Sequence, residues 1–141
     1  MTKKVLFLCI SNSCRSQMAE GILKALAPEK FEVFSAGAKA SFVHPFAVKV
    51  LGETGIDISG QRSKPVLKFK GREFDYVITV CGDSAKESCP SFMGKAGNRL
   101  HWNFEDPAQA KGTDEEVLKV FRKVRDEIKI EIEKFIKELL R

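Results

Sequence analysis

Residues 5–16 read Val-Leu-Phe-Leu-Cys-Ile-Ser-Asn-Ser-Cys-Arg-Ser, an apolar run followed by a short polar loop and an arginine. The apolar run predicts a buried strand, and the segment after Arg15 predicts a helix, so the polar residues form the turn between them. In such a turn, successive backbone N–H groups converge on one point, and the helix N-terminus adds positive potential there. The stretch therefore predicts an oxyanion-binding loop above Cys9.

The chemistry of this loop centres on Cys9. The local field favours the thiolate form of a cysteine, which makes it a nucleophile. Arg15 can hold two oxygens of a tetrahedral oxyanion, and Ser16 can donate a hydrogen bond to the thiolate. The alternative is that Cys9 is a core cysteine and Arg15 a solvated residue, but the strand before and the helix after the loop favour chemistry. The residues expected to bind the oxyanion are Ser11, Asn12, Ser13, Cys14, Arg15 and Ser16.

The composition is that of one compact domain spanning residues 1–141, with 43% hydrophobic and 30% charged residues. The longest apolar run, Val5 to Ile10, is too short to cross a bilayer or to form the core of a signal peptide. We therefore expect a cytoplasmic protein. The net charge of +5 is spread and mixed with acidic residues, which favours small anions over nucleic acid as ligands.

The four cysteines are Cys9, Cys14, Cys81 and Cys89. A chain of this size without an export signal does not need structural disulfides, so we expect the thiols to do chemistry. Their spacing lacks the short pairs of a zinc site, and we expect no metal. For Cys14 we favour a structural role, because one nucleophile in the loop is enough.

Strand and helix patterns alternate along the chain. The spacing predicts strands over residues 4–9, 31–35, 75–81 and 99–102, and helices over residues 16–26, from His44-Pro45 to about residue 53, and after the capping box 113–116, with a short helix possible after Pro65. Residues 82–97 show no convincing period and are expected to form a loop. Strands separated by helices predict an α/β fold in which a four-stranded parallel sheet has helices on both faces.

Three residues with reactive side chains lie at or after the ends of different predicted strands. Cys9 ends the first strand, Cys81 ends the third, and Asp106 lies in the loop after the fourth. Because ligands bind at the carboxyl ends of parallel strands, we expect these residues to meet at one edge of the sheet. Asp106 is also a suitable turn residue before Pro107, but this position favours catalysis. His101 and Trp102 are expected to pack near the site.

Several motifs together resemble the thioredoxin-coupled arsenate reductases, which are built on the low-molecular-weight tyrosine phosphatase fold. The resemblance runs nearly end to end. It rests on Cys9 to Ser16, Gln17-Met18-Ala19-Glu20-Gly21, Ser35-Ala36-Gly37, Val80-Cys81 with Cys89-Pro90, His101-Trp102, Asp106-Pro107-Ala108 and Val124-Arg125-Asp126-Glu127-Ile128. The first loop and Asp106-Pro107 are shared with the phosphatases, whereas the pair Cys81 and Cys89 is typical of the reductases.

The resemblance implies roles for the catalytic residues Cys9, Cys81, Cys89, Arg15 and Asp106. Cys9 would attack arsenate, held by Arg15, with Asp106 as general acid. Cys81 would then attack Cys9 and release arsenite, Cys89 would attack Cys81, and thioredoxin or a similar dithiol protein would reduce the last disulfide. The implied function is arsenate reduction in arsenical resistance, by a monomer with no resident cofactor and weak phosphatase activity.

Two other functions stay open. A low-molecular-weight protein tyrosine phosphatase would use Cys9 as a phosphocysteine intermediate, although its usual tyrosine or tryptophan beside the loop is hard to find in this chain. A non-catalytic redox sensor or phosphoprotein-binding module would keep the loop for anion binding alone, but the nucleophile, arginine and acid together argue against it.

Two positions depart from the pattern of the reductases. Seven residues separate Cys81 from Cys89, one more than is familiar in that family, and a disulfide between them requires residues 82–92 to move. Lys64 stands where some members have an aspartate that completes a monovalent-cation site with residues matching Asn12, Glu20 and Ser35. Because an ammonium group would occupy or repel that cation, we expect no potassium dependence.

Overall fold

Four parallel strands form the central sheet, in the order β2, β1, β3, β4. The computed structural model describes residues 2–82 and 90–140. The strands are β1 (Lys3–Cys9), β2 (Phe31–Gly37), β3 (Glu73–Thr79) and β4 (Lys95–His101). The predicted α/β fold with a four-stranded parallel sheet is confirmed. β1, which ends at Cys9, and β3, which ends shortly before Cys81, are neighbours at the centre of the sheet, so their carboxyl ends lie together.

Within residues 2–82 and 90–140, three α-helices and two short 3₁₀ helices accompany the sheet: α1 (Arg15–Leu26), α2 (Pro45–Gly52), α3 (Asp114–Leu139), η1 (Val66–Phe69) and η3 (Pro107–Gln109). The capping box predicted at the start of α3 is present, because the Thr113 hydroxyl accepts the Glu116 N–H and the Glu116 carboxylate accepts the Thr113 N–H. In the described part of the chain, no helix is long and apolar enough to cross a membrane.

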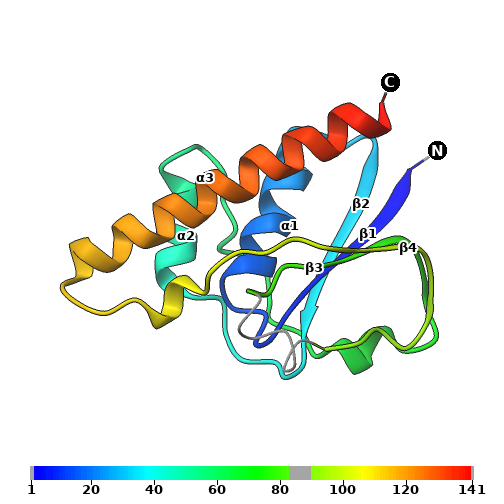
Figure 1. The fold of residues 1–141 in the computed structure, drawn as a ribbon, viewed down its shortest axis with the longest axis horizontal. Helices are drawn as coiled ribbons and strands as arrows, with labels where there is room; N and C mark the ends of the chain where they lie inside the picture. The colour runs from blue at the N-terminus through cyan, green and yellow to red at the C-terminus, as the bar shows by residue number, and fades with distance from the viewer. Residues whose placement is uncertain (1, 83–89, 141) are drawn as a thin grey trace.

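The two faces of the sheet have unequal cover. The three α-helices lie together on one side, and η1 lies on the other (Figure 1). Alternate residues of β1 serve the two sides, since Val5 and Phe7 pack with the α-helices while Leu6 and Leu8 pack with Phe69 of η1. Helices therefore cover both faces, as predicted, but among the described residues the second face is covered by the 3₁₀ turn η1 and the loop that contains Phe92. The apolar stripe of α3 supplies buried residues to the first face: Phe121, Val124, Ile128 and Ile132.

Three strands differ from their predicted bounds by two residues or more. β2 runs two residues further, to Gly37, and β3 begins and ends two residues earlier than predicted. β4 begins at Lys95 rather than at Arg99. Ala96 and Gly97 have low strand propensity, but they pair with β3, where a Cβ on Gly97 would lie 3.0 Å from the Asp75 carbonyl oxygen. Pairing with a neighbouring strand, which local sequence does not reveal, decides these bounds.

Two predictions lie outside the described residues or reach beyond them. Residues 83–89 are not among the described residues, and they include Cys89 and most of the segment 82–92 that is expected to move.

The ring of Trp102 packs against Phe7 of β1 and Phe135 of α3, with ring centroids 5.9 and 5.6 Å away. Trp102 is therefore a packing residue, as predicted, whereas the same prediction is wrong for His101, which is exposed and has its Nδ1 2.6 Å from Thr79 Oγ1.

Candidate active site

Cys9 ends β1 and is buried at the start of the oxyanion-binding loop. Its Sγ lies 2.8 Å from the Oγ of Ser16, in the first turn of α1. The Ser16 oxygen already accepts a hydrogen bond of 2.7 Å from Asn12 Nδ2. When Cys9 is a thiolate it can only accept, so the Ser16 hydroxyl donates to the sulfur, as the sequence analysis expected, and this contact stabilises the thiolate.

The backbone carbonyls of the loop are bonded to surrounding segments. Because C=O and the next N–H point in opposite directions across a trans peptide, these bonds turn the N–H groups of residues 11–14 toward the loop interior. The oxyanion-binding loop thus owes its shape to partners far away in sequence. The bonds go to Ile10 O from Ala38 N and Lys39 N (2.8 and 3.3 Å), to Ser11 O from Ser41 Oγ and Ser63 Oγ (2.9 and 3.1 Å), to Asn12 O from Gln17 Nε2 (3.1 Å) and to Ser13 O from His44 N (3.0 Å).

Asn12 is the structural centre of the loop. Its φ of 51° lies in the left-handed region, which asparagine tolerates better than most residues. Its buried side chain uses both ends. The Nδ2 group donates to Ser16 and Ser35, while Oδ1 accepts from Gln17 Nε2 and from the Lys64 backbone N–H. Asn12 therefore serves the loop as a scaffold residue as well as through its backbone.

Arg15 and Asp106 meet at the mouth of the loop. The Arg15 side chain is almost fully buried, and its Nη1 donates to the Phe104 carbonyl oxygen at 3.0 Å, while its Nη2 lies 3.8 Å from Oδ2 of Asp106. The other oxygen of Asp106 accepts the Ala108 N–H at 3.0 Å and caps η3. The two roles considered for Asp106 are compatible, because one oxygen serves the turn while the other faces the guanidinium.

Glu20 lies behind the loop, together with two lysines. Its carboxylate accepts hydrogen bonds from Ser35 Oγ and Lys24 Nζ, and Lys64 Nζ lies 3.9 Å away. Burial lowers the pKa of Lys64 from its usual value, and the charge of Glu20 opposes that shift. An ammonium group thus lies against the carboxylate at the position where the resemblance implied a cation site in some relatives.

The three described cysteines lie in different surroundings. Burial raises the pKa of Cys14 to about 12, so this thiol is protonated at neutral pH. Cys81 is buried just beyond β3, where the N–H of the preceding Val80 donates to the Leu8 carbonyl of β1. The next residue, Gly82, passes so close to the site that a Cβ there would lie 3.9 Å from Arg15 Nη1. The chain at Cys81 therefore borders the oxyanion-binding loop.

Sequence reasoning missed most of the loop's anchors. Ser41, Ser63 and His44 looked like ordinary loop and helix-start residues, because their partners are remote in sequence. It also missed an aromatic ring beside the loop. The Phe42 side chain is 63% exposed, and its ring stacks on the ring of His44. Phe42 directly follows Ser41, whose hydroxyl bonds to the Ser11 carbonyl, so an exposed aromatic ring adjoins a residue that holds the loop, although it is neither the tyrosine nor the tryptophan that the phosphatase alternative called for.

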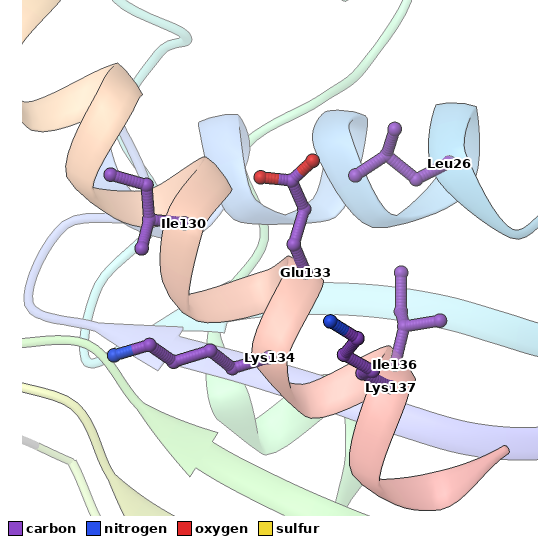
Figure 2. Close-up of a pocket in the computed structure, with 6 residues that line it drawn as sticks. All are labelled: Leu26, Ile130, Glu133, Lys134, Ile136 and Lys137. Carbon is purple, nitrogen blue, oxygen red and sulfur yellow. The ribbon is translucent and has the colours of Figure 1, made fainter. Parts of the chain in front are cut away.

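A separate groove of about 590 Å³ lies away from these residues, between the C-terminal parts of α1 and α3 (Figure 2). Leu26 comes from α1, and the other lining residues come from α3: Ile130, Glu133, Lys134, Ile136 and Lys137. Cys9, Cys81 and Asp106 do not line this groove. Within residues 2–82 and 90–140, no group of three or more His, Cys, Asp or Glu residues is placed to hold a metal ion.

Comparison with known proteins agrees with this geometry. The chain is 48% identical to the arsenate reductase of Shouchella clausii over 136 residues, covering 96% of each chain. It is 42% identical to the glutaredoxin arsenate reductase of a Synechocystis species, covering 97% of this chain and 98% of the relative. A solved structure of an arsenate reductase in its oxidised state is 39% identical and superposes with a TM-score of 0.81, covering 97% of this chain and 98% of that one.

The sequence profile of a whole family spans nearly all of the chain. The family is described as "Low molecular weight phosphotyrosine protein phosphatase", and its profile matches residues 4–141. The match includes the oxyanion-binding loop, the segment after β3 and the loop of Asp106. The chain therefore belongs to the low molecular weight phosphotyrosine protein phosphatase family.

Proposed function

We propose that this protein reduces arsenate to arsenite through a relay of three thiols. The observation that carries the proposal is the placement of a second buried cysteine, Cys81, just beyond β3, the strand that pairs with the strand of Cys9, because a phosphatase would not need it. The relatives named above are arsenate reductases, and this chain matches them over nearly their full length. A dithiol exchange also supplies the two electrons that arsenate reduction requires, so we propose no resident cofactor.

The first step is nucleophilic attack. The Cys9 thiolate, stabilised by Ser16 at 2.8 Å, attacks arsenic while Arg15 and the loop N–H groups hold the oxygens. One As–O bond breaks, and Asp106 donates a proton so that the oxygen leaves as water. The product is a covalent adduct in which the Cys9 sulfur is bonded to arsenic(V).

The second step is the redox step. The Cys81 thiolate attacks the Cys9 sulfur, the S–As bond breaks, and its electron pair stays on arsenic, which becomes arsenic(III) and leaves as arsenite. Cys9 and Cys81 are then joined by a disulfide. Cys89 attacks Cys81 and frees the Cys9 thiolate, and an external dithiol protein reduces the resulting Cys81–Cys89 disulfide with two electrons. We propose thioredoxin as that protein and a monomeric, cytoplasmic enzyme.

The test is arsenate-dependent NADPH consumption with thioredoxin and thioredoxin reductase, repeated with a glutaredoxin system. The wild type should turn over, and Cys81→Ser and Cys89→Ser should each stop after at most one turnover, because each breaks the relay. Cys14→Ser keeps the backbone N–H that faces the loop and removes only a thiol that stays protonated, so as a third cysteine-to-serine variant it should retain turnover. Undiminished turnover in Cys81→Ser or Cys89→Ser would contradict the relay.

The second candidate is a phosphatase, favoured by the exposed ring of Phe42 beside the loop. It would use Cys9, Arg15 and Asp106 and would leave Cys81 and Cys89 without a role in turnover. Rapid hydrolysis of an aryl phosphate that survives both serine substitutions, with no arsenate turnover, would establish it. Weak hydrolysis beside clear arsenate turnover fits the proposed reductase, because phosphate and arsenate have similar shapes.

A further inference from the structure

We infer that His44 is a positioning residue for oxyanion binding, acting through an unprotonated ring nitrogen that fixes the start of α2 against the loop. The inference rests on the anion site of the proposed function, but not on its redox steps. His44 lies outside the residues that hold the anion, and it acts on the loop through the carbonyl of Ser13.

The contact with the loop is made by the His44 backbone. Its N–H donates to the Ser13 carbonyl oxygen at 3.0 Å. Because the peptide that joins Ser13 to Cys14 is planar and trans, a carbonyl held toward α2 turns the Cys14 N–H the opposite way, into the loop. The direction of one anion-binding donor therefore depends on where the backbone of His44 lies.

The side chain of His44 fixes that backbone. Its Nδ1 accepts the Phe46 N–H at 3.0 Å, which makes His44 the N-cap of α2. The ring also packs on three aromatic neighbours, with centroids 4.8 Å from Phe121 of α3, 5.4 Å from Phe46 and 6.4 Å from Phe42. The imidazole thus fixes His44 against α2, α3 and the preceding loop. The backbone N–H of the same residue holds the Ser13 carbonyl.

This arrangement works only while Nδ1 is unprotonated. An imidazolium has no acceptor and would place a proton and a positive charge against the N-terminus of α2. The rings of Phe42, Phe46 and Phe121 that face His44 are uncharged, and the carboxylate that acts on it is Asp106, from the loop before η3. Burial lowers the pKa of His44, and Asp106 opposes this, so the ring is neutral at pH 7 and gains its proton in acid.

The effect should be confined to one part of the loop. The Ser11 carbonyl is held by the hydroxyls of Ser41 and Ser63, which do not titrate in this range. Acid should therefore misdirect the backbone N–H of Cys14 and leave the other backbone N–H groups of the loop in place. A partial loss of oxyanion affinity, rather than its abolition, is the signature of this role.

The test is sulfate binding by calorimetry from pH 8 to pH 5, because sulfate stays a dianion over this range and its binding needs no electron transfer. His44→Asn keeps an acceptor for the Phe46 N–H but does not titrate, and His44→Ala removes the acceptor. At pH 7.5 the wild type and His44→Asn should bind sulfate equally, and His44→Ala about fivefold more weakly, the scale of a lost N-cap. Toward pH 5 the wild type should lose about fivefold more affinity than His44→Asn.

The two proteins differ in one side chain, so a difference between their pH profiles reports on His44. Parallel pH profiles for the wild type and His44→Asn would overturn the inference even if His44→Ala fails to fold. Equal sulfate binding by His44→Ala and wild type at pH 7.5 would overturn it as well. A wild type that binds no sulfate would remove the anion site itself, and with it the proposed function. Loss of arsenate turnover with normal sulfate binding would reject only the redox proposal.

Discussion

Replacing Gly37 with alanine should disrupt the oxyanion-binding loop, although Gly37 lies outside the residues expected to bind the oxyanion. Gly37 ends β2, and a Cβ there would lie 2.6 Å from the Asn12 backbone nitrogen and 2.9 Å from both the Ile10 oxygen and the Ser11 carbonyl carbon. All three atoms are backbone, so no side-chain rotation relieves the contact. With ordinary contact at 3.4 Å or more, the loop must retreat by about 0.8 Å.

The size of the effect follows from that displacement. Overfilling a well-packed region costs about 1–3 kcal/mol of unfolding free energy. The same shift would misplace one or two donors to the anion, each worth about 1.5–3 kcal/mol when the acceptor is charged, so sulfate affinity should fall by at least about tenfold. Urea unfolding measures the first quantity and calorimetry with sulfate measures the second.

Gly52→Ala is the matched control. Gly52 ends α2, and a Cβ there meets nothing within 4 Å. Because alanine favours the helix, this variant should be as stable as the wild type or more stable by up to about 1 kcal/mol, with unchanged sulfate affinity. If Gly37→Ala matched the wild type in both assays, the close approach of β2 to the loop would not be what shapes the anion site.

Ser16→Ala removes the hydrogen bond to Cys9 and should slow alkylation of that thiol by iodoacetamide about tenfold, a rate that would stay unchanged if Ser16 only packed. Asp106→Asn keeps an oxygen to cap η3 but cannot donate the acid proton, so kcat with arsenate should fall about 10²-fold or more while sulfate affinity holds; a normal kcat would exclude Asp106 as the acid. Exchange of sodium for potassium should leave the wild-type rate unchanged, because the Lys64 ammonium lies against Glu20, and a clear increase would show that a cation still binds there.

The central strand and the loop after it could be predicted from the sequence, since the residue patterns that indicate them are local. An apolar run, a polar turn and a helix start follow one another within twelve residues, and hydrogen bonds inside that stretch join Cys9, Asn12 and Ser16. The capping box at residues 113–116 was legible for the same reason. Convergence at the sheet edge needed only the rule that parallel strands share a carboxyl end, given the alternating pattern.

The start of β4 was not legible. Its first residues have little strand character, and their extended form comes from pairing with β3, more than twenty residues away in sequence. The anchors of the loop were hidden in the same way. Ser41, His44 and Ser63 lie roughly 30 to 50 residues from the carbonyls that they hold, and serines and a histidine in loops carry no signal of such contacts.

The sequence by itself determined the alternation of strands and helices and the placement of Cys9, the candidate nucleophile, and Arg15 in one loop, because each depends on side chains that are close along the chain. Only the tertiary structure decided the direction of the loop's donors, the meeting of Arg15 with Asp106, and the position of Lys64 against Glu20. These features depend on backbone groups and charges brought together by the completed sheet. Since hydrogen bonds and ion pairs act only at short range in space, their partners are set by the fold rather than by the order of residues.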